Sequence, residues 1–431
     1  MLTRVVRLLL PAALLAAAPL CPIPGLGQAL AQVQQPADAA APAEAKPASE
    51  AKPLEIRIGL ITRAVPPPPL YDLLAVPEDE AVAGAELAMK DNSTTGLFTG
   101  QSFVLETTTL AEDEDPAEAA RALMANGTRL LLVNLPGPEL LKVADAAKDD
   151  AAKGNAAKDK GAVVFNVGAP DDALRAQDCR ADVFHVAPSR AMLTDALAQF
   201  LASKRWSKLF LVTGPQPGDL LYAEALRRSA KKFGLKIVAD KPWTFGPLGR
   251  ERSDSITRSD ALVFSRGVDA DVIVVADEAN DFGNYIPFRT FEPRLVVGTQ
   301  GLTASTWHPA QDAWGSAQLQ SRFLRSASRT MRPVDYQAWV AARMIGEATT
   351  RTKSADPATI AKFLRTPDFS LAAFKGVPVS IRPWDQQLRQ PLLIAQPLGI
   401  VSLAPEEGFL HQRTPLDTLG TDQGESKCRL K

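Results

Sequence analysis

Short apolar runs alternate with amphipathic stretches along most of the chain. The runs at 129–134, 162–167, 208–213 and 271–276 are continuous enough to predict strands buried on both faces of a parallel sheet. Between such runs, apolar residues recur at helical spacing, as they do over 219–233. Because this strand–helix alternation occurs in two successive blocks, we predict an α/β protein with two doubly wound parallel-sheet lobes.

The first residues follow a different pattern. Arg4 and Arg7 precede an almost wholly apolar run at 8–20, and small residues follow at 29–31. This layout is typical of a secretory signal peptide, and the apolar run is shorter than the ~20 residues of a membrane-spanning helix. We therefore expect residues 1–31 to be cleaved and the protein to reach the periplasm.

Two further features belong to this N-terminal region. Cys21 leaves lipoprotein processing open as an alternative, although the bulky residue before it fits that processing badly. Residues 32–53 are rich in Ala, Pro, Glu and Lys and have few large apolar side chains, so we predict a disordered linker.

Composition narrows the choice of function. The chain has 431 residues, enough for two globular units, and a formal net charge of −1 at pH 7. A nearly neutral chain with interspersed charges has no basic footprint for nucleic acid, so we expect no nucleic-acid partner. No stretch after the signal region is apolar for long enough to span a membrane.

Two cysteines remain after the predicted cleavage, Cys179 and Cys428. An exported protein meets an oxidising compartment, so we expect these two to form a disulfide that fastens a polar C-terminal tail to the body. The alternative is a pair of unbonded thiols, because sequence alone does not supply the distance between them.

No catalytic signature is present. The sequence lacks a GxSxG elbow, an HExxH motif and a phosphate-binding glycine loop. His185, His308 and His411 lie far apart and lack the spacing of metal ligands. We therefore predict a protein that is not an enzyme and that has no cofactor and no dedicated metal ligands.

The best polar candidates follow predicted strands, where doubly wound sheets bind ligands. Asp277 and Glu278 come directly after the apolar run at 271–276, and Gln300 follows another such run. Adjacent carboxylates are suited to an amine or to a hard metal ion. The alternative is that they only begin a helix, where the helix dipole favours acids.

The order of several segments resembles the type I periplasmic solute-binding proteins of the leucine/branched-chain amino acid group. The resemblance rests on RIGLIT, AGAELAMKDNSTTG, LLLVNLPGPEL, VVFNVGAPDD, FHVAPSRAMLTDALAQFL, KLFLVTGPQPGDLLYAEALRRSAKKFGLKIV, DVIVVADEAND, VVGTQGLTAS and VDYQAWVAARMIGEA. It implies a Venus-flytrap fold, in which a hinge joins the two lobes. One lobe would comprise 54–187 and 297–340, the other 188–296 and 341–403, with a tail at 404–431.

A narrower resemblance concerns three segments: RAVPPPP, GVPVSIRPWDQQLRQPLLIAQP and the ending LDTLGTD…CR. They are similar to binding proteins associated with pyrroloquinoline-quinone (PQQ)-dependent alcohol dehydrogenase systems. The resemblance implies the permease and ATPase subunits of an ABC importer as partners, together with a periplasmic PQQ dehydrogenase.

The resemblance also implies ligand contacts at strand ends. In this sequence they fall at Asn134, Gly168 and Ala169, and Tyr222 matches the family's cleft tyrosine. The Ser and Thr that the family uses at the first positions are absent, and nearby prolines remove amide donors, which argues against an amino acid ligand. Tyr222 either stacks on a ligand or packs beneath its helix.

The proline-rich loop after the first predicted strand would border the cleft. Arg63 and Tyr71 flank this loop, so they either line the cleft or belong to a rigid surface loop. We expect a periplasmic receptor that captures a small molecule between its lobes for an importer. Two alternatives remain: a sensory or scaffold protein that binds a dehydrogenase or receptor, and an uptake receptor for lanthanide or calcium ions.

Overall fold

The computed structural model describes residues 53–65, 75–153, 161–245, 261–287 and 289–430. The predicted signal peptide, Cys21, nearly all of the predicted linker and Tyr71 lie outside these residues. In the part that is described, no helix is both long and apolar enough to cross a membrane.

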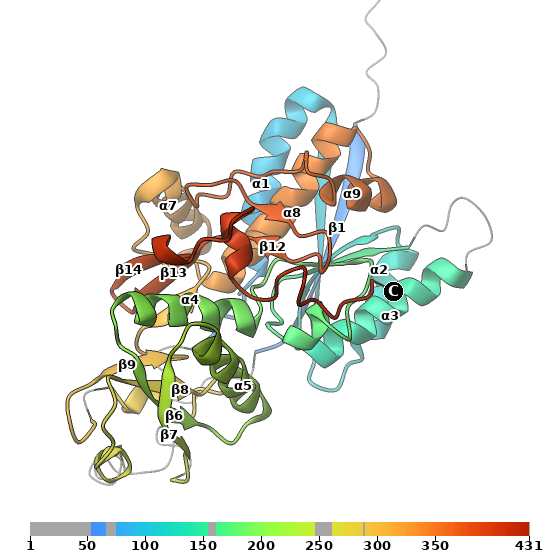
Figure 1. Ribbon diagram of the computed structural model, residues 1–431. Coiled ribbons are helices and arrows are strands. Elements are labelled where there is room, and N and C mark those ends of the chain that lie inside the picture. Colours follow the sequence, from blue (N-terminus) through green and yellow to red (C-terminus); the bar gives the residue numbers. More distant parts are fainter. Residues whose placement is uncertain (1–52, 66–74, 154–160, 246–260, 288, 431) are drawn as a thin grey trace, which may run out of the picture. The chain divides into compact units, whose positions relative to one another are not determined.

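The first sheet is parallel throughout and has five strands in the order β2-β1-β3-β4-β5 (Figure 1). Its strands are β1 (Leu54–Arg63), β2 (Gln101–Leu110), β3 (Leu130–Asn134), β4 (Val163–Asn166) and β5 (Val183–His185). The predicted apolar runs at 129–134 and 162–167 supply β3, which pairs with β1, and β4, which pairs with β3, and both strands are buried.

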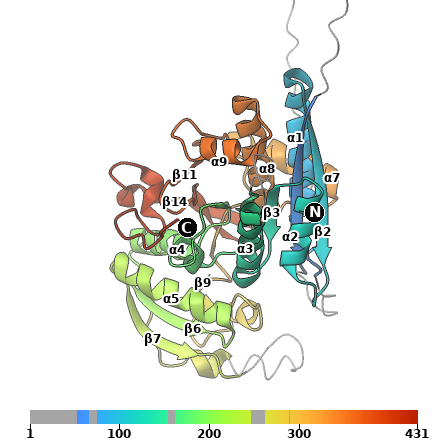
Figure 2. The same cartoon turned by 90° about the vertical axis from the view of Figure 1, so that its right-hand side faces the viewer.

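Helices cover both faces of this sheet. Successive residues of β1 point to opposite sides, and apolar side chains on each side need to be buried. Ile58 and Leu60 pack into a core formed with α1 and α8, whereas Ile61 packs into a core formed with α2 and α3. Figure 2 shows α1 and α8 side by side on the first of these faces. The helices are α1 (Val82–Thr99), α2 (Pro116–Ala125), α3 (Gly137–Lys153) and α8 (Pro333–Thr352).

The contact between α1 and α8 needs a glycine. A Cβ atom at Gly84 would collide with the backbone carbonyl of Asp335. The carboxylate of Asp335 accepts a hydrogen bond from the backbone N–H of Ala81 at 3.0 Å, just before α1 begins. Arg329 forms an ion pair with the same carboxylate at 2.6 Å. A late segment of the chain therefore holds the start of the first helix.

The second sheet is also parallel and has four strands in the order β7-β6-β8-β9. They are β6 (Lys208–Thr213), β7 (Lys236–Pro242), β8 (Val272–Ala276) and β9 (Leu295–Gly298). Helices α4 (Arg190–Ser203) and α5 (Pro217–Lys232) pack on one face, and an aromatic cluster around Trp243 and Phe282 covers the other.

Smaller elements complete the fold. An antiparallel sheet of order β10-β13-β14 adds to the core of the second sheet, and β11 pairs with β12 in a hairpin. Their bounds, with those of the remaining helices, are β10 (Thr303–Ser305), β11 (Ser380–Ile381), β12 (Leu388–Arg389), β13 (Leu392–Gln396), β14 (Gly399–Ala404), α7 (Ser316–Ala327) and α9 (Pro357–Leu364).

The predicted lobe boundaries differ from the packing. Most of 341–403 was expected with the second lobe, but Met344, Leu364 and Leu388 are buried in the core of the first sheet. Conversely, β9 begins before residue 297 and belongs wholly to the second sheet. Both cores are built from similar apolar side chains, so the sequence pattern does not indicate which sheet a late helix covers.

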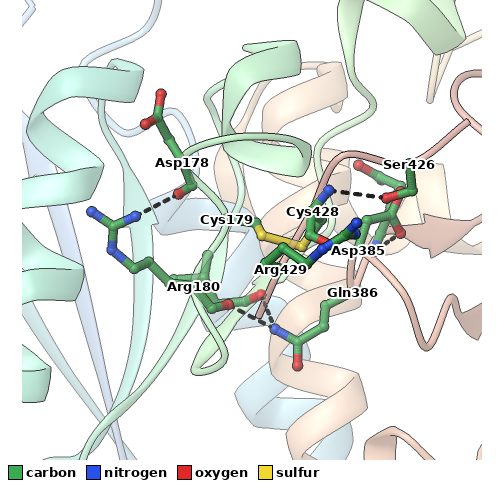
Figure 3. The surroundings of a disulfide bond; sticks show 10 residues. Asp178, Cys179, Arg180, Asp385, Gln386, Ser426, Cys428 and Arg429 are labelled. Atoms are coloured by element: carbon green, nitrogen blue, oxygen red, sulfur yellow. Dashed lines mark hydrogen bonds between the residues drawn. A yellow bond between two sulfur atoms is a disulfide. The ribbon is translucent and has the colours of Figure 1, made fainter. Parts of the chain in front are cut away.

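The predicted disulfide is present. Cys179 and Cys428 are bonded, with their Cα atoms 5.7 Å apart, and both side chains are buried (Figure 3). The bond joins the end of the tail to the loop that precedes β5. The tail is therefore attached to the first sheet as well as following from β14.

Candidate functional site

The candidate site lies at the carboxyl ends of the parallel strands. In the first sheet these ends are formed by the residues that follow β1, β3 and β4, and in the second sheet by those that follow β6, β8 and β9. Every predicted ligand contact that the structure describes lies at or just beyond such an end, or on α5, which follows β6.

Arg63 is used within the first lobe. Its guanidinium forms an ion pair with Glu139 at 2.7 Å and donates hydrogen bonds to the backbone carbonyls of residues 111, 112 and 114. These contacts tie the end of β1 to the loop before α2 and to the first turn of α3. Arg63 thus braces the first lobe at the end of β1.

The tip of the first sheet is held by two asparagines. Asn134 Nδ2 donates a hydrogen bond to Thr62 Oγ1 at 3.3 Å. Asn166 Oδ1 accepts from the backbone N–H groups of Gly168 and Ala169 at 3.2 and 2.8 Å. These two amides were expected to face a ligand, but they are already paired inside their own loop. Asn134 is partly exposed and remains a candidate contact.

Tyr222 lies on α5 and is 3% exposed. Burial raises the pKa of its hydroxyl above the ordinary value, and the nearby carboxylate of Glu278 adds to the rise. The ring belongs to the apolar core of the second sheet. In this structure Tyr222 therefore packs beneath its helix, which was the second of the two alternatives. Its hydroxyl is near enough to the strand ends to feel the charge of Glu278.

Asp277 closes the loop that follows β8. Its buried carboxylate accepts hydrogen bonds from the backbone N–H groups of Asp281, Phe282 and Gly283, at 2.9, 2.9 and 2.6 Å. Both oxygens are engaged in this way, so the side chain caps the loop that follows β8. This is close to the helix-start alternative, because a 3₁₀ turn begins at Gly283.

Gln300 supports the same loop. Its amide nitrogen donates to the backbone carbonyl of Asp277 at 2.8 Å, and the side chain is 8% exposed. Its oxygen accepts from the hydroxyl of Thr299. Gln300 therefore orders the ends of β8 and β9 from within, and its polar atoms are directed at protein groups.

A third carboxylate in this region, Asp219, also bonds to backbone. It accepts from the N–H groups of Gln216 at 3.1 Å and of Glu278 at 2.6 Å. It thereby caps α5 and holds the loop after β8 against that helix. Burial raises the pKa of Asp219, and these hydrogen bonds oppose the rise.

Glu278 differs from its neighbour because its partner is a cation. Arg190 Nε and Nη2 donate to the two oxygens of Glu278 at 2.8 and 2.6 Å, a bidentate pair. Arg190 Nη1 lies 3.1 Å from Asp171 Oδ1. Arg190 and Glu278 belong to the second lobe, whereas Asp171 follows β4 in the first, so the guanidinium joins the two lobes.

Burial sets the electrostatics of this triad. It raises the pKa of Glu278, and the hydrogen bond and charge of Arg190 oppose that rise. The pKa of Arg190 is raised by its two carboxylate partners, which outweigh its burial. Arg190 is 6% exposed in total, so its charge depends on these carboxylates.

Sequence reasoning missed Arg190. It is the first residue of α4, where the helix dipole disfavours a cation. The signal available in the sequence was a cation at a helix start, five residues beyond the end of β5, which is the last strand of the first sheet.

A cavity of about 820 Å³ lies beside Arg190. Its walls are the loop at 171–177 from the first lobe, α4 and α5 from the second, and residues of the C-terminal tail between 420 and 427. Charged groups of both signs line it, together with alanines and Leu221. The cavity is large enough for a small organic solute.

Metal binding finds no support in the residues that the structure describes. Among them, no group of three or more His, Cys, Asp and Glu side chains is arranged to hold an ion. The carboxylates of Asp219 and Asp277 are bonded to backbone N–H groups, and Glu278 is bonded to Arg190.

Two doubly wound parallel sheets, joined by repeated chain crossings and facing each other through charged strand-end loops, define a two-lobed binding protein. The chain matches the periplasmic binding protein family over residues 80–398 and belongs to that family. Its architecture is the type I periplasmic binding protein fold, as predicted. Because this is a family of binding proteins, the assignment agrees with the prediction that the chain is not an enzyme.

Solved structures show the same fold at low sequence identity. A periplasmic binding protein from Burkholderia mallei is 15% identical, with a TM-score of 0.62, over 87% of this chain and 99% of that one. The closed conformation of the leucine-, isoleucine-, valine-, threonine-, and alanine-binding protein from Brucella ovis is 14% identical, with a TM-score of 0.67, over 88% and 100%.

A third similar structure is a branched chain amino acid ABC transporter periplasmic ligand-binding protein from Burkholderia xenovorans, which is 16% identical. It has a TM-score of 0.65 and covers 87% of this chain and 99% of its own. No curated protein matches the chain.

Proposed function

We propose that this protein is the exported, solute-capturing component of an ABC-type importer. The observation that carries the proposal is the contact of Arg190 with Asp171 of the first lobe and Glu278 of the second. A binding protein that closes on its solute needs groups of both lobes within reach of one small molecule. In this structure those groups meet beside a cavity of suitable size.

The solute that we propose is not a free amino acid. The Brucella ovis neighbour is a leucine-, isoleucine-, valine-, threonine-, and alanine-binding protein, and an amino acid presents an ammonium group to its receptor. In this chain the carboxylates of Asp219, Asp277 and Glu278 are all engaged within the protein. An ammonium would have to displace Arg190 from Glu278, which costs the ion pair that already fills that position.

We further propose a link to PQQ-dependent alcohol oxidation, with a permease, an ATPase and a periplasmic dehydrogenase as partners. The support is the resemblance of residues 376–397 and of the ending LDTLGTD…CR to proteins of such systems. Export follows from the signal-peptide pattern at 1–31. Co-purification from periplasm tests the partners: a dehydrogenase recovered without importer subunits would favour a scaffold role instead.

The capture of a solute is tested by thermal shift of the mature protein. The panel contains alcohols, aldehydes, carboxylic acids, quinone cofactors, free amino acids, and calcium and lanthanide ions. A true ligand raises the melting temperature progressively with its concentration. We expect a response to an organic member of the panel and none to leucine or to the metal ions.

A matched pair of variants locates the response. Asn134→Ala removes a partly exposed polar group at the end of β3, whereas Asn126→Ala removes an exposed one at the far end of α2. The first is expected to weaken the shift and the second to leave it unchanged. A panel without any concentration-dependent response would overturn solute capture, and a response to leucine alone would overturn the proposed solute class.

A further inference from the structure

The C-terminal tail first packs on the second lobe. Leu419 is buried in the core that α4 and α5 form with the second sheet. The backbone N–H of Gly420 donates to Asp195 Oδ2 at 2.8 Å. Lys232 Nζ donates to the carbonyls of Thr418 and Gly420, each at 3.0 Å. Residues 418–420 are therefore fixed to α4 and α5.

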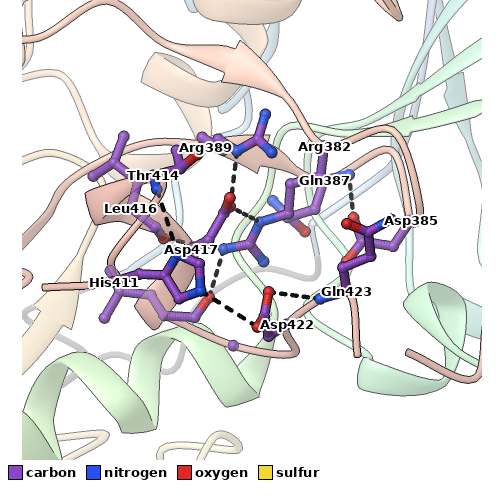
Figure 4. A network of polar contacts seen from close by, with 12 residues as sticks. Arg382, Asp385, Gln387, Arg389, His411, Thr414, Leu416, Asp417, Asp422 and Gln423 are labelled. Atoms are coloured by element: carbon purple, nitrogen blue, oxygen red, sulfur yellow. Dashed lines mark hydrogen bonds and ion pairs between the residues drawn. The ribbon is translucent and has the colours of Figure 1, made fainter. Parts of the chain in front are cut away.

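A buried ion triad holds the same stretch of the tail (Figure 4). Asp417 Oδ1 accepts from Arg382 Nε at 2.9 Å and from Arg389 Nε at 2.8 Å. Arg382 is 1% exposed and also donates to the carbonyl of Leu419 at 2.7 Å. Arg382 directly follows β11 and Arg389 ends β12, just before the chain passes from the first core to the second.

The end of the tail is attached to the first lobe. Cys428 is bonded to Cys179, in the loop between β4 and β5 (Figure 3). Gln386 Nε2 binds that loop through the carbonyls of Arg180 and Val183, at 3.0 and 2.7 Å. The tail therefore begins on one lobe and ends, through a covalent bond, on the other.

The intervening residues have a limited reach. A fully extended chain spans at most about 3.5 Å per residue, so the stretch from Gly420 to Cys428 reaches about 28 Å. It also covers the cavity beside Arg190, because Gly420, Thr421, Glu425 and Lys427 form part of its wall. Opposite lie residues 171–177 of the first lobe.

We propose that residues 417–428 form a covalently closed strap. It is a further connection between the lobes, beside the chain crossings at 186–192, 304–307 and 388–392. The strap limits how far the lobes separate and keeps the cavity beside Arg190 covered. The crossings and the strap lie on different segments, so the lobes can open at the crossings only as far as the strap reaches. The inference concerns motion of the protein itself and holds whether or not the proposed solute is found.

The test lengthens the strap without breaking its bond. Gly424 is exposed, and a Cβ atom there would meet no neighbour within 4 Å, so six Gly–Ser residues are inserted after it. Gly424→Ala is the matched control of unchanged length, and Cys428→Ser removes the bond itself. A thiol titration of the mature protein checks that the disulfide is intact in the lengthened chain and in the control.

Two measurements report on the separation of the lobes. Small-angle scattering gives the radius of gyration. Hydrogen exchange follows the backbone N–H groups of Arg190 and Ala191, which donate across the lobes to Pro170 O at 2.8 Å and Asp172 Oδ1 at 2.9 Å. In the lengthened chain we expect a larger radius of gyration and about tenfold faster exchange of these amides. The Gly424→Ala control should match the unaltered protein.

Loss of the disulfide and a negative result for the lengthened chain also test whether the strap restrains the lobes. Cys428→Ser, or reduction with dithiothreitol, which adds two electrons and two protons and yields two thiols, should reproduce the lengthened chain. If the lengthened chain matches the unaltered protein in both measurements, the strap does not restrain the lobes. A change on losing the bond without a change on lengthening would overturn the proposal too, because the bond would then act only locally.

Discussion

The carboxyl-terminal edges of the two parallel sheets are closed by different kinds of side chain. In the first sheet, the side-chain oxygen of Asn166 accepts hydrogen bonds from backbone N–H groups of its own loop, and the side-chain nitrogen of Asn134 donates one to Thr62. In the second sheet, carboxylates accept the corresponding hydrogen bonds. Asp277 accepts from backbone N–H groups of the loop after β8, and Asp219 accepts from the backbone N–H just before α5. The same strand-to-helix connection is thus closed once by neutral groups and once by charged ones.

The difference teaches how polar residues at strand ends should be interpreted. A carboxylate after a buried strand suggests a ligand site, yet a loop that leaves a sheet also has unpaired N–H groups that need acceptors. Asp277 accepts hydrogen bonds from three such N–H groups, whereas its neighbour Glu278 accepts them from the side chain of Arg190. The two residues are of similar type. The direction of the side chain decides that Asp277 caps its own loop and that Glu278 places its charge between the lobes.

The largest expected effect comes from Asp277→Ala. The change leaves three backbone N–H groups, two of them buried, without an acceptor, so we expect the free energy of unfolding to fall by about 3 kcal/mol. The counterpart in the first sheet, Asn166→Ala, should lower it by about 2 kcal/mol because two N–H groups lose their acceptor. Urea denaturation monitored by circular dichroism measures both.

Asp281→Ala is the control, because among the described residues its carboxylate makes only a long, exposed contact with Gln216 at 3.4 Å. It should change the unfolding free energy by less than about 0.5 kcal/mol. Equal losses in the Asp277 and Asn166 variants would show that the number of N–H groups left without an acceptor does not set the loss of stability.

Much of the fold could be predicted from the sequence because four strands of the two sheets, β3, β4, β6 and β8, are compact apolar runs. The strands at 129–134, 162–167, 208–213 and 271–276 need no partner to be recognised. The assignment of late helices to a lobe could not be predicted in the same way. Tyr336 and Trp339 contribute to the apolar face of α8, but no feature of the neighbouring sequence indicates that this face packs on the first sheet.

The candidate site was predictable in position and less so in its residues. The strand ends were found, with Glu278 among them, because the pattern places them in the chain. Arg190 was missed because its role depends on Asp171 and Glu278, which come from loops 19 residues before it and 88 after it. The roles of Asp277 and Gln300 depend on side-chain direction, which spacing does not specify.

Lys375→Met should have the next largest effect, and it extends the comparison to buried cations. Lys375 is 1% exposed, its ammonium donates to the carbonyl of Thr306, and it lies over the ring of Tyr336. No carboxylate pairs with it among the described residues, and burial lowers its pKa to about 7. Methionine fills a similar volume without the amine, so we expect about 2 kcal/mol of added stability at pH 7.

The sign of the pH dependence follows from the two pKa values of Lys375. The unfolded chain titrates near 10.5 and the folded protein near 7, so between these values the unfolded state binds more protons. The penalty is complete below about pH 7 and disappears as the pH approaches 10.5. The gain from Lys375→Met should therefore shrink across this window in denaturation curves. A gain that does not vary with pH would show that the lysine keeps its charge in the fold.

The smallest effect is expected for Arg190→Gln, which tests how the charged edge differs from the neutral one. Glutamine keeps a donor for Glu278 but removes the charge, and both carboxylates of the triad are about one quarter exposed, so solvent screens the loss. We expect the free energy of unfolding to fall by about 1 kcal/mol at pH 7.

The effect of Arg190→Gln should depend on pH in a direction that the triad sets. Burial already raises the pKa of Glu278, and loss of Arg190 removes the main group opposing that rise. Above the unfolded pKa of a glutamate, the folded variant then binds more protons than its unfolded chain, so its stability relative to the unaltered protein declines as pH rises. Melting temperatures from pH 4 to pH 8 measure the difference, with Arg227→Gln, an exposed ion-pair arginine on α5, as the control. If the difference is constant across this range, Glu278 does not depend on Arg190 for its charge, and the link between the lobes is weaker than the geometry indicates.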